Sequence, residues 1–153
     1  MANTYQQLYI QTVFAVKFRN ACIQQAWKKN LHAVVANLIN ETGCKTITCN
    51  GVEDHVHCLL ALKASCSVSD LMQNVKAKSS KWVNENGLIR HRFEWQSGYG
   101  AFSYNQKEVP VVYKYIQRQE EHHRKKSFRE EYLELLREFK VDYNENYIFR
   151  DPE

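Results

Sequence analysis

The stretch that decides the fold is GVEDHVHCLL, residues 51–60, which carries His55 and His57 one residue apart. Side chains two positions apart on a strand point to the same face. One face of this segment is therefore apolar, and the other carries both imidazoles. The apolar face consists of Val56, Cys58, Leu60 and Leu62. We expect a strand over residues 54–62 whose apolar face packs against helices.

Two imidazoles on one strand face fit either a divalent-metal site or a chance pair. Neutral imidazole is the commonest protein ligand for divalent metals, and the Cβ atoms of His55 and His57 would lie roughly 7 Å apart, close enough to share one ion. With 6 histidines in 153 residues, a His-x-His spacing also arises readily by chance. The pair alone leaves both interpretations open, and a third ligand from elsewhere in the chain would favour the metal site.

The segments around this strand alternate between strand and helix patterns. We expect strands over residues 5–17, 45–50 and 54–62, helices over 20–41 and 67–86, and a bent strand over 93–104. A further helical region is expected from residue 108 onward, with a break near 126–127. Asn20 is expected to cap the first helix, and Asn50-Gly51 to form a turn. This order predicts an α+β fold, a ferredoxin-like or RRM-like antiparallel sheet with helices on one face and an open second face, followed by C-terminal helices.

The composition is that of an ordinary globular protein, with 44% hydrophobic and 25% charged residues. We expect residues 1–153 to form one domain, since no repeat or linker interrupts them. No apolar run approaches the roughly 20 residues of a membrane span, and no signal sequence precedes the first strand pattern, so we expect a cytoplasmic protein without a membrane partner. The 5 cysteines contain no CxxC pair, which argues against a disulfide framework or a structural zinc site. The net charge of +4 is compatible with a polyanionic partner.

A second polar group lies on the helix pattern VVYKYIQRQEEHHRKK, residues 111–126. On a helical wheel, Tyr115, Gln119 and His122 border the apolar stripe of that helix, whereas Tyr113 lies beyond it. The stripe consists of Val109, Val112 and Ile116. Tyr115 and Gln119 are one turn apart, so Gln119 could complete a His-His-Gln metal site with Tyr115 beside it. A half-buried tyrosine and a solvated glutamine is the alternative.

Four segments together resemble the single-tyrosine HUH transposases of bacterial single-strand insertion sequences, a family that includes the REP-associated tyrosine transposases. These segments are YIQTVFAVKFRN, GVEDHVHCLLAL, FEWQSGYGAFSY and the helix containing EEHHRKKSF. HUH denotes His-hydrophobic-His, here residues 55–57. The resemblance implies that Tyr115 is the catalytic nucleophile and that Gln119 is a metal ligand with the two histidines. The doublet His122-His123 departs from the family pattern, which leaves open whether either residue supplements or replaces Gln119.

The resemblance also implies a reaction and its partners. Such a transposase cleaves and rejoins single-stranded DNA at insertion-sequence ends by transesterification, through a 5′-phosphotyrosine intermediate. The implied cofactor is Mg²⁺ or Mn²⁺, although a histidine-rich donor set alone would also suit zinc. The implied partners are a single-stranded DNA hairpin at the element ends and a second copy of the chain, with the tyrosine helix acting in trans in some members.

Basic side chains beside aromatic ones are suited to single-stranded DNA, because they offer both phosphate pairing and base stacking. The predicted DNA-binding residues are Lys17, Arg19, Lys78, Lys81, Trp82, Arg90, Arg92 and Phe102. Two other functions fit the sequence. One is a non-catalytic RRM-like module that binds single-stranded nucleic acid on an open sheet face. The other is a host-adopted relative that nicks its own repeat DNA.

Overall fold

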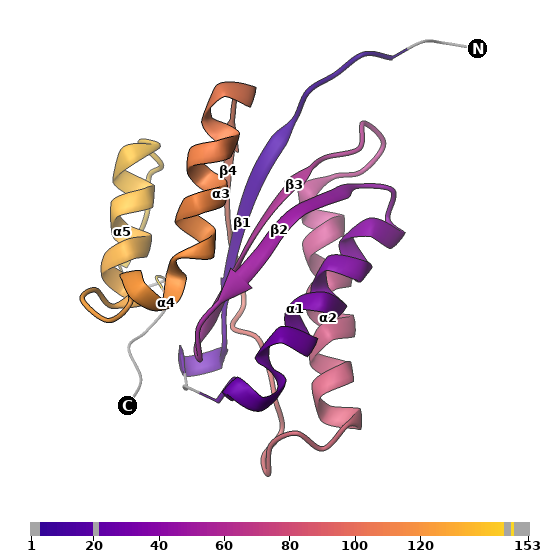
Figure 1. Cartoon of the computed structure of the whole chain (residues 1–153), viewed down its shortest axis with the longest axis vertical. Coiled ribbons are helices and arrows are strands. Elements are labelled where there is room, and N and C mark those ends of the chain that lie inside the picture. The colour runs from indigo at the N-terminus through magenta and orange to yellow at the C-terminus, as the bar shows by residue number, and fades with distance from the viewer. Residues whose placement is uncertain (1–3, 20–21, 146–147, 149–153) are drawn as a thin grey trace.

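The centre of the molecule is a four-stranded antiparallel sheet (Figure 1) in a computed structural model that describes residues 4–19, 22–145 and 148. The strands are β1 (Tyr9–Ala15), β2 (Lys45–Gly51), β3 (His55–Ala61) and β4 (Gly100–Tyr104). They lie in the order β2-β3-β1-β4, and β3 pairs with both β2 and β1. The predicted α+β fold with a ferredoxin-like antiparallel sheet is confirmed, and the histidine strand lies inside the sheet.

Two helices, α1 (Gln25–Glu41) and α2 (Val68–Glu85), cover one face of the sheet (Figure 1). Val56, Cys58 and Leu60 of β3 are fully buried in the core on this face. The helices contribute Leu31, Val35, Ile39, Leu71, Met72 and Val75 to the same core. The predicted division of β3 into an apolar face and a histidine face is therefore correct.

Three further helices cover the second face, which the sequence predicted to be open. They are α3 (Val109–Gln117), α4 (Gln119–His122) and α5 (Phe128–Glu138), and Figure 1 shows them on the side of the sheet opposite α1 and α2. The prediction failed because α3 and α5 each carry an apolar stripe that needs a surface to pack on. Ile116 of α3 packs on Leu59, and Phe128 of α5 belongs to a cluster with Val13 and Ala15. As a result, the histidine face of β3 is buried.

The turn predicted at Asn50-Gly51 lies further along the chain. Gly51 is the last residue of β2 and pairs with Val56, so the chain reverses over residues 52–54. A Cβ atom at Gly51 would lie 2.1 Å from the backbone oxygen of His55. Glycine is required here because the two backbones approach more closely than a side chain permits.

Several helix and strand boundaries also differ from the predictions. The strand predicted over 93–104 is reduced to β4 and an isolated bridge between Trp95 and Val16, with Gly98 at a positive φ of 87° between them. Helix α1 begins after Gln24, and the predicted cap Asn20 lies outside the described residues. Two short 3-10 helices, η1 (Lys17–Arg19) and η2 (Gln106–Glu108), complete the structure. Ser127 caps α5 and so confirms the predicted break. No helix among the described residues is both long and apolar enough to cross a membrane.

Candidate metal centre and tyrosine site

The polar side chains on the covered face of the sheet converge on one residue, Glu131 of α5. Glu131 is 1% exposed, and His55, His57 and Gln119 are each 0% exposed. Burial of so many polar groups at one place is costly unless each is paired. In this structure these polar groups are paired with one another.

Three histidines present the same ring edge to this centre. Nδ1 of His55 lies 2.7 Å from Asp54 Oδ1, and Nδ1 of His123 lies 2.7 Å from the backbone oxygen of Lys126. Nδ1 of His57 lies 2.7 Å from Oε1 of Gln11, a buried β1 residue. Each Nδ1–H therefore donates to an oxygen on the outer side of the cluster. This fixes the ring orientation and leaves every Nε2 facing inward.

The three inward Nε2 atoms surround one oxygen of Glu131. Oε1 lies 2.9 Å from Nε2 of His57, 3.0 Å from that of His123 and 3.5 Å from that of His55. One ligand atom from each of these four residues lies within 4.8 Å of the others. Since ligand atoms that share an ion at about 2.0–2.2 Å lie roughly 3 Å apart, the cluster has the dimensions of a divalent-metal site.

Tyr115 and Gln119, one turn apart in the chain, both reach Glu131. The Tyr115 hydroxyl donates a hydrogen bond to Oε2 of Glu131. Nε2 of Gln119 donates to the same oxygen at 3.1 Å, while its Oε1 lies 3.0 Å from Nε2 of His55. The structure thus brings Tyr115, Gln119 and both strand histidines together within one chain. Of the predicted doublet, His123 faces Oε1, and His122 lies at the rim with its Nε2 3.4 Å from Oε2.

The charges of the cluster are strongly coupled. Burial raises the pKa of the Glu131 carboxyl, but the neighbouring imidazoles outweigh burial and hold that pKa well below its usual range. Burial lowers the pKa of His55, but hydrogen bonds to Asp54 and Glu131 outweigh it and raise that pKa to about 9. Burial also lowers the pKa of His57. Glu131 is therefore a buried carboxylate that a cation on the imidazole side must balance.

Tyr115 is a weak nucleophile in this environment. Burial, followed by the negative charge of Glu131, raises its pKa well above the usual range. A cation bound among the imidazoles would oppose both effects, because it would offset the charge of Glu131 and favour the phenolate.

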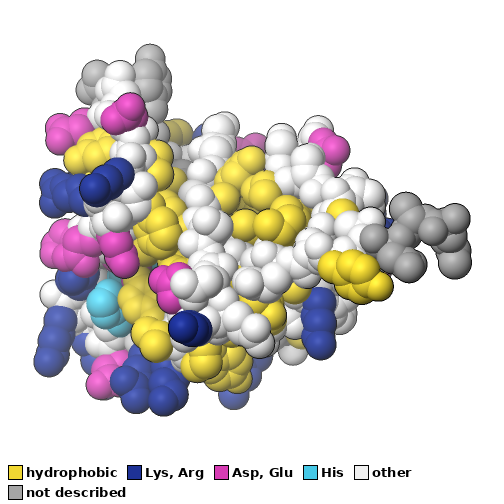
Figure 2. Space-filling view, turned by 90° about the horizontal axis from the view of Figure 1, so that it is seen from above, with side chains coloured by type: hydrophobic (Ala, Val, Ile, Leu, Met, Phe, Trp, Pro, Cys, Tyr) yellow, Lys and Arg dark blue, Asp and Glu magenta, His cyan; other side chains and the backbone are white. Residues whose placement is uncertain are grey.

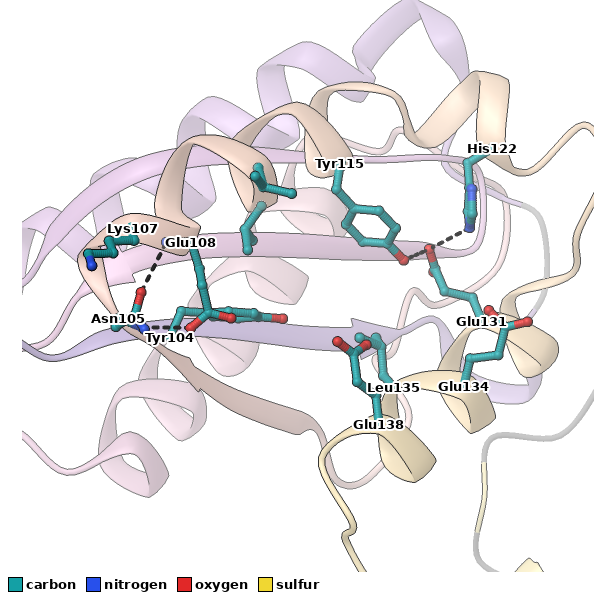
Figure 3. Close-up of a pocket in the computed structure, with 12 residues that line it drawn as sticks. Tyr104, Asn105, Lys107, Glu108, Tyr115, His122, Glu131, Glu134, Leu135 and Glu138 are labelled. Atoms are coloured by element: carbon teal, nitrogen blue, oxygen red, sulfur yellow. Dashed lines mark hydrogen bonds and ion pairs between the residues drawn. The ribbon is translucent and has the colours of Figure 1, made fainter.

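A hollow of about 420 Å³ opens beside Tyr115, between α3 and α5. Figure 3 shows the Tyr115 hydroxyl pointing toward Glu131 across this hollow, with His122 on the far side of the carboxylate. Tyr104, Val112 and Leu135 supply apolar wall, and Glu108, Glu134 and Glu138 supply carboxylates. Tyr115 therefore borders a hollow that opens to solvent.

A second hollow, of about 590 Å³, adjoins the site at His122 and is lined by Glu121 and by four basic side chains. The basic side chains are Arg118, Arg124, Lys125 and Lys126. Figure 2 shows lysine, arginine and acidic side chains gathered toward the side of the molecule where α5 lies, and a histidine side chain reaches the surface among them. Lys126 is paired with Glu134, and the other three basic side chains outweigh Glu121, so this rim of the site keeps a net positive charge suited to a phosphate backbone.

The predicted DNA-binding residues are spread over the molecule rather than gathered at this site. Lys78, Lys81 and Trp82 lie on α2, which covers the opposite face of the sheet. Lys17 and Arg92 both line a separate hollow of about 380 Å³ and pair with Glu94. Arg90 is exposed in the loop before Phe93, and the Arg19 side chain lies outside the described part of the structure.

Phe102 does not have the exposure that base stacking requires. It is 3% exposed, and its ring lies 4.9 Å from that of Phe139 between the sheet and α5. Its aromatic face is therefore occupied by the core, and the ring does not contribute a DNA-binding surface in this arrangement.

Sequence reasoning missed Glu131, Asp54 and Gln11. Glu131 left a readable signal, because it falls within the apolar stripe of α5, whose other buried members are Phe128, Tyr132, Leu135 and Leu136. An acidic residue inside an otherwise apolar stripe requires a buried partner. Asp54 and Gln11 left weaker signals, since a polar residue next to a strand or on its outer face is ordinary.

Comparison with known proteins assigns the chain to a transposase family. Residues 4–119 match the family model described as "Transposase IS200 like", and the chain therefore belongs to the IS200-like transposase family. The match ends at Gln119, so α5 and Glu131 lie beyond it. No curated protein matches the chain significantly.

Two solved structures have similar folds. The first is a candidate transposase from Deinococcus radiodurans R1, with a TM-score of 0.63 and 16% identity over 78% of this chain and 95% of the other. The second is a REP-associated tyrosine transposase bound to a REP hairpin, with a TM-score of 0.60 and 13% identity over 80% of this chain and 73% of the other. At these identities the similarity concerns the fold.

Proposed function

We propose that this chain is a metal-dependent single-strand DNA transposase in which Tyr115 is the nucleophile and His55, His57 and Gln119 are metal ligands. The observation that carries the proposal is the convergence of Tyr115 and Gln119 on the paired histidines of β3, in a member of the IS200-like transposase family. The ring of Tyr115 lies 5.8 Å from that of His57 within one chain.

The proposed reaction is a transesterification at a phosphodiester of single-stranded DNA. The Tyr115 oxygen forms a bond to phosphorus, the bond from phosphorus to the 3′-oxygen breaks, and that oxygen leaves as a 3′-hydroxyl with a proton. The result is a 5′-phosphotyrosine link, which a later 3′-hydroxyl attacks to rejoin the DNA. A bound Mg²⁺ or Mn²⁺ would polarise the phosphate and neutralise developing charge.

Residues of this chain would position the Tyr115 hydroxyl and the DNA for this reaction. Glu131 accepts hydrogen bonds from the Tyr115 hydroxyl and from the Gln119 amide, and so would position the hydroxyl. The DNA would reach it through the adjacent hollow. The basic rim at Arg118 and Arg124 would pair with flanking phosphates. The DNA hairpin bound by the REP-associated relative makes a hairpin end the first substrate to test. We also propose that the chain acts as a homodimer.

A non-catalytic RRM-like module is less well supported. Such a module would bind bases on an exposed sheet face, whereas α3 and α5 cover this face and bury Phe102. It would also give no function to the buried contacts between Tyr115 and Glu131.

The test is incubation with a single-stranded hairpin oligonucleotide and Mn²⁺, followed by denaturing gel electrophoresis for a covalent adduct. The unaltered chain should form an adduct that Tyr115→Phe abolishes. Tyr113→Phe is the matched control, since Tyr113 lies on the same helix and is 42% exposed. His57→Ala should lose the adduct while hairpin binding persists. An adduct that survives in Tyr115→Phe and disappears in Tyr113→Phe would show that the nucleophile is misassigned.

A further inference from the structure

We infer that Glu131 of α5 is a ligand of the same ion as His55 and His57, with His123 as the third imidazole, and that it links this ion to Tyr115. The inference deepens the proposed function and rests on it, because it concerns the same metal. It adds a carboxylate from a helix that lies beyond the matched family region.

The hydrogen bonds at Nδ1 determine where the imidazole lone pairs point. His55 and His123 donate from Nδ1 to a carboxylate and a backbone carbonyl, which are acceptors only, so the neutral form of each ring carries its lone pair on Nε2. His57 has the same orientation toward Gln11. Three Nε2 lone pairs then face a carboxylate oxygen at 2.9–3.5 Å. Lone pairs at these distances repel one another unless a proton or a metal cation lies between them, and one divalent ion can replace the protons at all three rings.

The charge of a divalent ion also favours Glu131 as a ligand. Two imidazoles and the amide of Gln119 are neutral donors and would leave a buried divalent ion without an anionic ligand. Glu131 is the anion whose oxygens face the imidazoles, and it is 1% exposed. A carboxylate also makes the donor set more suitable for Mn²⁺ or Mg²⁺, which favour oxygen ligands, than three imidazoles alone.

The two carboxylate oxygens of Glu131 have different partners. Oε1 faces the three imidazoles, whereas Oε2 accepts the hydroxyl of Tyr115 and the amide of Gln119. Glu131 lies in the first turn of α5, where the backbone dipole favours a negative charge. One rigid side chain thus joins the ion to the nucleophile, and we assign it the roles of ligand and positioning residue for Tyr115.

The test is the affinity for Mn²⁺ alone, measured by calorimetry or by electron paramagnetic resonance without DNA. Glu131→Gln keeps the shape of the side chain and should weaken Mn²⁺ binding at least about tenfold. Glu134→Gln, the same change one turn along α5 at an exposed residue outside the cluster, should leave the affinity within about twofold. Tyr115→Phe should also leave it within about twofold, because the phenol is not a ligand.

Two results would overturn the inference. Equal Mn²⁺ affinity in Glu131→Gln and the unaltered chain would mean that the ion uses the histidines and Gln119 only. Tighter binding in Glu131→Gln would mean that Glu131 obstructs the ion. If the variant does not fold, anomalous diffraction from Mn²⁺-soaked crystals of the unaltered chain decides the question, since the inference requires a bond between Glu131 and the ion. Failure of the unaltered chain to bind Mn²⁺ would instead remove the metal from the proposed function itself.

Discussion

Nε2 of His57 and Oε1 of Glu131 lie 2.9 Å apart, although the two residues are 74 positions apart in the sequence. Their contact depends on the packing of α5 against the sheet, through Phe128 and the strand residues Val13 and Ala15. The centre is therefore assembled by the tertiary fold, and changes in packing, in outer hydrogen bonds or in surface charge should each have a distinct effect.

The first prediction concerns Asp54, which holds His55 through Nδ1 at 2.7 Å. Asp54→Asn removes the negative charge that orients the ring and increases its basicity. We expect the Mn²⁺ affinity to fall about tenfold, measured by calorimetry, with little change in hairpin affinity. Glu53→Gln is the matched control at the exposed neighbouring residue and should leave the Mn²⁺ affinity unchanged. Equal affinities in both variants would show that Asp54 does not tune the site.

The second prediction concerns the packing of the tyrosine helix. Ile116 is 0% exposed and packs with Leu59 and Val112. Ile116→Ala should lower the free energy of unfolding by about 2–5 kcal/mol, because it leaves a cavity under α3. Val111→Ala changes a residue of the same helix that is 70% exposed and should cost less than about 0.5 kcal/mol. Urea denaturation measures both, and similar costs for the two variants would contradict the packing of α3 on the sheet.

The third prediction is a pH dependence from His32, which is 7% exposed on α1. Burial, then the nearby Lys28, lower the pKa of His32 to about 4, and Glu120 opposes them. Between pH 6.5 and about 4 the unfolded chain binds a proton at His32 that the folded chain does not. The contribution of His32 to the free energy of unfolding is therefore fully present above about pH 6.5. It falls by roughly 3 kcal/mol in total as the pH drops through about 4.

Two variants test this assignment by chemical denaturation at pH 7, 5.5 and 4.5. Both His32→Leu and His32→Gln remove the titrating ring, so each should become more stable relative to the unaltered chain as the pH falls. A stability difference that stays constant with pH in both variants would exclude His32 as the source. The leucine variant should also be more stable at neutral pH than the glutamine variant, because Nε2 of His32 is buried and has no hydrogen-bond partner among the described residues.

The fourth prediction distinguishes two DNA-binding surfaces. If DNA follows the basic hollow beside His122, the double variant Arg124→Ala, Lys125→Ala should weaken hairpin binding. The slope of log affinity against log salt should fall by about 1 to 1.5, since two phosphate contacts to a single strand are lost. Filter binding at several salt concentrations measures the slope.

Two further double variants complete the comparison. Lys78→Ala, Lys81→Ala tests the surface of α2 that the sequence suggested, on the opposite face from the site. Lys29→Ala, Lys45→Ala removes the same charge at exposed residues that neither line the basic hollow nor lie on α2. If only the α2 variant changes the salt slope, the hairpin binds on α2 and the basic hollow has no part in it.

The sequence by itself determined the strand and helix pattern and the faces of the central strand. Alternation with a period of two residues requires Val56, Cys58 and Leu60 to share one side and His55 and His57 the other, whatever the rest of the chain does. The apolar stripe of the helix pattern over residues 111–126 likewise placed Tyr115 and Gln119 at the border of a buried surface. These conclusions depend on local geometry, which each segment carries in its own residues.

Only the tertiary structure decided what covers the histidines and which groups meet there. A helix pattern gives the apolar face of α5 but not the surface on which that face packs, so the covered second face of the sheet was not predicted. The partner of His57 was missed for the same reason, because Glu131 reaches it only after α5 packs on the sheet. Packing and electrostatic pairing act through space, and no local period relates residues that are 74 positions apart.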